Sequence, residues 1–149
     1  MEFDPDIIVT GEAWPRTRMV VETKLEKRHL PEVTSQLKRY MAAMSCPLGL
    51  LVLPDQVWIF RERYTGDDDG SIEQLGPYSL AGVFPPMAPG PDAGVKFEDL
   101  VQNWITDLIA AERPTGGPSE LVKAIEEHVL PMVVGGDVAA AHPREYATR

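Results

Sequence analysis

Residues 5–24 read PDIIVTGEAWPRTRMVVETK, and this stretch decides how the rest of the chain is interpreted. It contains two apolar runs rich in β-branched side chains, over residues 6–9 and 18–25, and such runs are typical of strands. The connection between them holds Gly11 and Pro15 and is longer than a two-residue turn. We therefore expect a β-hairpin with a projecting loop.

The pattern changes to a helical period after Pro31, where apolar side chains recur on one helix face from Val33 to Met44. Two further apolar runs, over residues 48–53 and 57–64, are typical of strands. The order of strand, strand, helix, strand and strand predicts an α/β fold with a mixed β-sheet flanked by helices.

The second half of the chain has a different composition. Five prolines fall within residues 76–94, so we expect an extended proline-rich loop there. Apolar stripes over residues 96–134 predict C-terminal helices that cover one sheet face. Residues 135–149 lack a sustained apolar pattern and are expected to form a flexible tail. We predict one domain over residues 1–134, with its core in residues 4–64.

Composition limits the class of protein. The chain has 149 residues, is 44% hydrophobic and carries a formal net charge of −9. This length suits one compact domain, and no apolar run approaches the roughly 20 residues that cross a bilayer. The first residues are acidic and do not resemble a signal peptide. Cys46 is the only cysteine, which excludes an intrachain disulfide. We expect a cytoplasmic protein.

The basic residues of the first half are concentrated in one segment. Residues 16–39 hold seven basic side chains against three acidic ones, whereas the chain as a whole is acidic. Such a segment can form a local surface that faces phosphates. The alternative is an ordinary solvated surface of a strand and a helix.

Three charged residues of the hairpin are expected to meet. The two-residue repeat of a strand places Glu22 and Lys24 on one face, and the hairpin can bring Asp6 beside Glu22. Two neighbouring carboxylates repel each other unless a cation compensates them. Oxygen ligands of this kind suit Mg²⁺, so we expect a divalent cation held by Asp6 and Glu22.

These residues also carry a resemblance to a known family. Pro5-Asp6 followed by Glu22-Thr23-Lys24 resembles the PD-(D/E)XK signature of the restriction-endonuclease-like nuclease superfamily. The following helix contains QLKRY at residues 36–40, which is similar to the QxxxY motif of RecB-type nucleases and of the N-terminal nuclease domain of type I restriction motor subunits. The resemblance covers about residues 4–64.

The resemblance implies a restriction-endonuclease-like core and hydrolysis of DNA phosphodiester bonds with Mg²⁺ or Mn²⁺, in restriction, defence or repair. By matching position, Asp6, Glu22 and the backbone carbonyl of Thr23 would be metal ligands. Lys24 would position the attacking water, and Gln36 would support the site. The residues expected to contact DNA are Arg16, Arg18, Lys27, Arg28, Lys38, Arg39 and Tyr40.

The sequence departs from this family in one respect. In the family a helix, and usually another strand, precede the Pro-Asp strand, and that helix often carries an acid at the site; here five residues precede Asp6. One hypothesis is that a homodimer or a larger complex supplies these elements. The alternative function is an inactive nuclease-fold module for nucleic-acid binding or protein interaction. Independently of either function, the structural alternative for these residues is that Glu22 and Lys24 are an exposed pair on an edge strand and that Tyr40 belongs to the core.

Overall fold

The computed structural model describes residues 4–63, 69–114 and 116–144. They form a six-stranded sheet in the order β5-β4-β3-β2-β1-β6. Strands β2 and β3 are parallel, and the other neighbouring pairs are antiparallel. The strands are β1 (Ile7–Thr10), β2 (Thr17–Thr23), β3 (Leu48–Val52), β4 (Gln56–Glu62), β5 (Ile72–Ser79) and β6 (Asp137–Ala140). The predicted α/β fold with a mixed sheet is confirmed.

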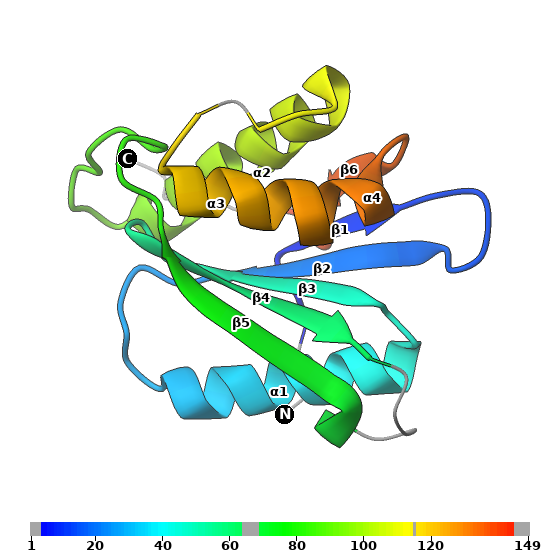
Figure 1. Ribbon diagram of the computed structural model, residues 1–149. Helices are drawn as coiled ribbons and strands as arrows, with labels where there is room; N and C mark the ends of the chain where they lie inside the picture. Colours follow the sequence, from blue (N-terminus) through cyan, green and yellow to red (C-terminus); the bar gives the residue numbers. More distant parts are fainter. Residues whose placement is uncertain (1–3, 64–68, 115, 145–149) are drawn as a thin grey trace.

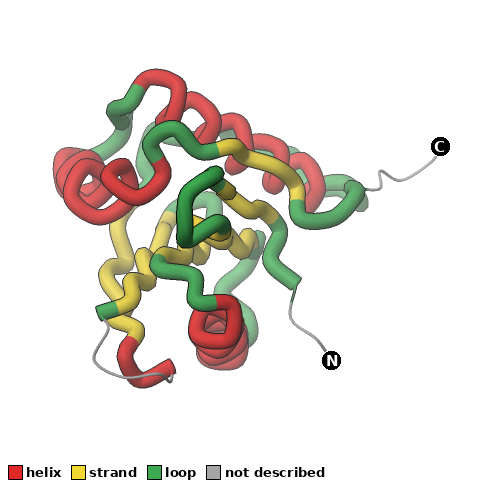
Figure 2. The backbone as a smooth tube through the Cα atoms, turned by 90° about the vertical axis from the view of Figure 1, so that its right-hand side faces the viewer, coloured by secondary structure: helices red, strands yellow, loops and turns green. Residues whose placement is uncertain are grey.

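Helices lie on both faces of this sheet (Figures 1 and 2). Helix α1 covers one face, and α2, α3 and α4 cover the other, with a π-helix, η2, between α3 and α4. None of the helices in the described ranges combines the length and the apolar character needed to cross a membrane. The helical elements are α1 (Leu30–Met44), η1 (Asp69–Ser71), α2 (Ala93–Ala111), α3 (Ser119–Ala124), η2 (Ile125–Val129) and α4 (Leu130–Val133).

Helix α1 is the crossover between the parallel strands β2 and β3. Its predicted stripe is buried at Val33, Leu37 and Met41, whereas Met44 in the last turn is 51% exposed. Gly49 of β3 allows the helix to pack closely, because a Cβ atom at this position would lie 2.7 Å from the Met41 sulfur. This contact holds the C-terminal part of α1 close to the start of β3.

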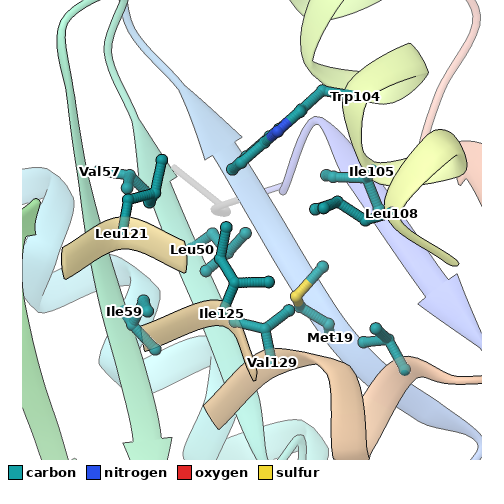
Figure 3. A pocket seen from close by; sticks show the side chains of 11 residues that line it. Met19, Leu50, Val57, Ile59, Trp104, Ile105, Leu108, Leu121, Ile125 and Val129 are labelled. Carbon is teal, nitrogen blue, oxygen red and sulfur yellow. The ribbon is translucent and has the colours of Figure 1, made fainter. Parts of the chain in front are cut away.

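The opposite face of the sheet carries the larger apolar layer, part of which is shown in Figure 3. Side chains from the sheet meet side chains from α2, α3, η2 and α4 in this layer. The space that they enclose is about 10 Å³, so this layer is packed core and not a ligand site. The lining residues are Met19, Leu50, Val57, Ile59, Trp104, Ile105, Leu108, Leu121, Ile125, Val129 and Val133.

The expected proline-rich loop over residues 76–94 begins later than predicted. Strand β5 continues through Gly76 and Pro77 to Ser79, and α2 begins at Ala93. Proline and glycine are tolerated here because β5 is an edge strand and its pairing with β4 shifts register opposite this point. Gly76 has φ +105°, a conformation that favours glycine. The prediction was therefore wrong for residues 76–79 and for residues 93–94.

The expected tail over residues 135–149 is also wrong in its first part. Residues 137–140 form β6, which pairs with β1, and Val138 packs against the apolar layer. Gly136 makes the entry possible, since a Cβ atom here would lie 2.8 Å from Val9 Cγ1. Small residues can form this strand because backbone hydrogen bonds, which leave no side-chain pattern, hold it to β1. Residue 64 of the predicted core and residues 145–149 lie outside the described residues.

Candidate active site

Asp6 lies immediately before β1 and faces the end of β2. Its backbone N–H donates to the Val21 carbonyl at 2.9 Å, and the pairing of Ile7 with Val21 puts Asp6 opposite Glu22. Its Oδ2 atom accepts hydrogen bonds from the backbone N–H of Thr23 at 2.8 Å and from the Thr23 hydroxyl at 2.9 Å. The structure thus brings together the acids that the hairpin was expected to join.

Glu22 is buried and Asp6 largely buried, and together they carry one negative charge. Glu22 is 6% exposed, and the side chain of Asp6 is 13% exposed. Burial, followed by the hydrogen bond and the charge of Asp6, raises the pKa of Glu22 to about 9. Burial opposes ionisation of Asp6 as well, but hydrogen bonds from Glu22 and Thr23 outweigh it and lower the pKa of Asp6. At neutral pH, Glu22 is therefore protonated and Asp6 is charged.

Lys24 is the first residue after β2. Its backbone N–H donates to the Val52 carbonyl at 3.0 Å, which continues the parallel pairing with β3 for one more residue. Its positive charge is close enough to lower the pKa of Glu22, although burial and Asp6 outweigh this effect. The structure therefore keeps Lys24 within electrostatic reach of the acid pair, and Glu22 is not the exposed residue of the alternative interpretation.

The donor atoms at this end of the sheet suit a hard cation. Two carboxyl groups face each other, and the Thr23 carbonyl lies on the same side, because Val21 and Thr23 both turn their backbone groups toward β1. In the described part of the chain, no three His, Cys, Asp or Glu side chains are grouped to hold a metal ion. Mg²⁺ commonly takes one or two protein carboxylates and completes its shell with water and phosphate oxygens. Asp6, Glu22 and the Thr23 carbonyl fit that requirement.

Four further polar residues reach this site and were not among the predicted site residues. Glu98 of α2 is in hydrogen-bonding contact with Asp6. Arg144, which follows β6, donates to Glu98 Oε2 at 2.9 Å and to Asp99 Oδ1 at 2.7 Å. His142 Nε2 lies 3.9 Å from Asp6 Oδ1. Burial and the charge of Asp6 raise the pKa of Glu98, which Arg144 partly opposes.

The sequence carries a weak signal for one of these residues and none for the others. Phe97 is the first residue of the predicted apolar stripe of α2 and is buried in the structure. Glu98 follows it directly, so the sequence already placed an acid next to the packed face of the helix. Its neighbour in space, Asp6, is 92 positions earlier in the chain. Arg144 and His142 lie beyond a strand that the apolar pattern did not reveal.

The two helix residues of the QxxxY motif behave differently from the acids. Gln36 is exposed on α1, and no hydrogen bond joins it to Asp6, Glu22 or Lys24 within the described ranges. Tyr40 is partly buried and packs against the apolar cluster under α1, as its core interpretation expected. Burial raises the pKa of Tyr40. The structure thus leaves a supporting role of Gln36 as a prediction.

The basic residues predicted to contact DNA lie at both ends of the sheet. Lys27 and Arg28 are exposed in the connection from β2 to α1, directly after the acid site. Arg16 and Arg18 lie at the other end of β2, near the β1–β2 loop at the right of Figure 1. Arg18 is four residues before Glu22, or about 13 Å along the strand. The basic residues of this segment are therefore distributed over both ends of β2.

Helix α1 carries the remaining two basic candidates. Arg39 is exposed and donates to the Ser35 hydroxyl at 2.9 Å, and Lys38 is half-buried. Lys38 and Arg39 lie on α1 itself, and Lys27 and Arg28 lie in the connection that leads into it. Helix α1 and this connection therefore hold four of the six predicted basic contacts.

Comparison of the chain with models of protein families, with curated proteins and with solved structures finds no match. A function for this chain is therefore inferred from the geometry of the acid site, formed by Asp6, Glu22 and Lys24.

Proposed function

We propose that the chain has a restriction-endonuclease-like core and hydrolyses DNA phosphodiester bonds with Mg²⁺ or Mn²⁺ at a PD-(D/E)XK-type site. The observation that carries this proposal is the pair of Asp6 and Glu22, of which Glu22 is buried and Asp6 largely so, with Lys24 directly after Glu22 and Thr23. Burying two carboxyl groups side by side opposes folding, since one of them has to be neutralised. A binding role for a cation gives this arrangement a physical reason.

The chemistry assigned to each residue follows from its atoms. A bound divalent cation supplies positive charge for the phosphate oxygens and lowers the pKa of a water molecule. Asp6, Glu22 and the Thr23 carbonyl would hold that cation. Lys24 would orient the attacking water or stabilise negative charge on the phosphate. Phosphodiester hydrolysis by this route needs no nucleophilic side chain.

The DNA surface proposed for this site begins at the connection between β2 and α1. Lys27 and Arg28 are exposed there and lie next in the chain to the acid site. Lys38 and Arg39 would extend this surface along α1. Because the whole chain carries a net charge of −9, we propose that DNA binding is local and strengthened by the cation.

Cleavage assays test the proposal directly. Supercoiled plasmid and linear single- and double-stranded DNA are incubated with the chain in Mg²⁺, Mn²⁺ or EDTA. We expect cleavage that EDTA abolishes and that Asp6→Asn and Lys24→Ala each reduce by roughly a thousandfold, the scale of losing charge stabilisation in a reaction's transition state. Equal cleavage by the wild type and both folded variants would contradict the proposed site.

A second candidate is the same fold without catalysis, acting as a nucleic-acid-binding or protein-interaction module. The observation that favours it is that a proton on Glu22 already satisfies the acid pair without any cation. A folded wild-type chain that binds DNA without cutting it in any metal would support this function. A homodimer or larger complex stays a prediction, but the strand beside β1 is supplied by β6 of the same chain.

A further inference from the structure

The segment that follows β6 crosses the acid end of the sheet. The backbone N–H of Ala141 donates to the Asp6 carbonyl at 3.0 Å, and His142 Nε2 lies 3.9 Å from the Asp6 carboxylate. Arg144 then turns to α2 and pairs with Glu98 and Asp99. This segment is therefore built into the surroundings of the proposed site.

Arg144 is held more firmly than an ordinary surface arginine. Its side chain is 12% exposed, and its hydrogen bonds to Glu98 and Asp99 are 2.9 and 2.7 Å long. Its Nη2 atom is buried and has no hydrogen-bond partner among the described residues. Burial of an unsatisfied donor opposes folding. Arg144 is therefore not explained as an ordinary surface residue whose guanidinium is solvated by water.

Glu98 connects this arginine to the acid pair. Its side chain is 16% exposed and is in hydrogen-bonding contact with Asp6. Burial and the charge of Asp6 favour a proton on Glu98, whereas the Arg144 guanidinium favours the ionised form of Glu98, so the contact between the two acids depends on Arg144. Because a guanidinium is planar and has donors at fixed angles, it also fixes the orientation of the carboxylate that it binds. Arg144 therefore acts on Asp6 indirectly, through Glu98, which contacts both.

We propose that Glu98 and Arg144 are a positioning pair, which fixes the Asp6 carboxylate in the orientation that binds the catalytic cation. This inference rests on the proposed function. It assigns a part of the site to α2 and to the segment after β6, although neither belongs to the hairpin that carries Asp6, Glu22 and Lys24. Removing the pair should weaken cation binding while the hairpin stays intact.

The test measures Mg²⁺ binding to the full chain by calorimetry, and kcat and KM for plasmid cleavage. We expect Arg144→Gln to raise the Kd for Mg²⁺ by roughly tenfold to a hundredfold, the usual effect of losing a group that orients a metal ligand. We expect kcat to fall and KM for DNA to stay unchanged. Arg144→Lys keeps the charge without the planar geometry and should recover part of the loss.

A double variant protects the test against misfolding. Arg144→Gln alone leaves Glu98 without its partner, whereas Glu98→Gln with Arg144→Gln removes both charges and should fold. Arg63→Gln is the matched control, since Arg63 forms a 3.8 Å surface ion pair with Glu73 and should change nothing. An unchanged Kd for Mg²⁺ in the folded double variant would overturn the positioning role. Faster cleavage by Arg144→Gln would overturn it too and would indicate a contact that blocks the site.

Asp6→Asn separates the two proposals. If Asp6→Asn loses Mg²⁺ binding and cleavage while the double variant keeps both, the proposed function stands and the positioning pair is wrong. If Asp6→Asn binds Mg²⁺ like the wild type, the cation site itself is wrong, and the positioning role falls with it.

Discussion

The apolar layer under α2 and the acid end of the β1–β2 hairpin are both shielded from solvent. Burial of the apolar layer favours folding, whereas burial of the acids opposes it. In the apolar layer, contact between the sheet and the helices removes apolar surface from water and stabilises the fold. At the acid end, burial keeps a proton on Glu22 and leaves a donor of Arg144 unpaired. Adjacent residues of α2 belong to the two regions, since Phe97 packs in the layer and Glu98 contacts Asp6. The helix that completes the core also completes the acid site.

The largest expected effect separates activity from stability at the acid end. Glu22→Gln removes a proposed ligand, and we expect cleavage to fall by roughly a thousandfold, or about 4 kcal/mol of transition-state stabilisation. The same variant should raise the melting temperature at pH 8, because it no longer has to bury an ionisable group. Cleavage assays and thermal unfolding on one sample measure both. If Glu22→Gln were less stable than the wild type and fully active, the acid end would contribute to stability and not to activity, contrary to this expectation.

A substitution in the apolar layer should have the opposite signature. Leu108 of α2 is 1% exposed and lines the layer in Figure 3. Leu108→Ala should lower the free energy of unfolding by about 3 kcal/mol, since it removes buried methyl groups and leaves a cavity. Cleavage per folded molecule should be unchanged. Val134→Ala, at a residue that is 39% exposed, is the control for urea unfolding and should change stability little.

The pH dependence of stability distinguishes the regions without any mutation. The pKa of Glu22 is raised from 4.5 to about 9, so between these pH values the folded chain holds a proton that the unfolded chain has lost. Stability should therefore fall as pH rises through this window, by about 1.4 kcal/mol per pH unit. Asp6 adds no slope there, since its lowered pKa leaves it ionised in both states.

Urea unfolding at several pH values measures this slope. Glu22→Gln should reduce it and leave the smaller part that comes from Glu98, whose pKa is also raised, while Leu108→Ala should shift the whole curve and keep the slope. Saturating Mg²⁺ should also reduce the slope, because a bound cation favours the ionised form of Glu22. A wild-type curve that rises between pH 6 and pH 9 would show that Glu22 is not the protonated member of the pair.

The smallest expected effect concerns the basic residues at the two ends of the sheet. Lys27→Gln and Arg28→Gln, next to the acids, should each raise KM for DNA by about threefold, equivalent to roughly 0.7 kcal/mol for an exposed charge. Arg16→Gln, at the opposite end of β2, should change KM less. Cleavage measured at several salt concentrations tests this order. Equal effects at both ends would mean that DNA spans the whole sheet.

Strong local patterns allowed much of the fold to be predicted. The hairpin, α1, β3 and β4 have continuous apolar runs or a clear helical stripe, and the structure confirms them with shifted ends. Residues 76–79 and 137–140 were missed, because an edge strand tolerates proline and a strand of small residues has no side-chain pattern. Pairing energy in these strands comes from the backbone, which is the same for every sequence apart from proline.

The acid site divides in the same way. The pairing of Asp6 with Glu22, and the position of Lys24, followed from the hairpin and from the two-residue repeat of its strands. The contacts of Glu98 and Arg144 depend on how α2 and β6 dock against β1, and on distances of 92 and 138 positions along the chain from Asp6. The sequence by itself determined the local chemistry, because neighbours in a hairpin are close in any fold. Only the tertiary structure decided which distant charges surround it, because packing of the apolar layer sets where α2 and β6 lie.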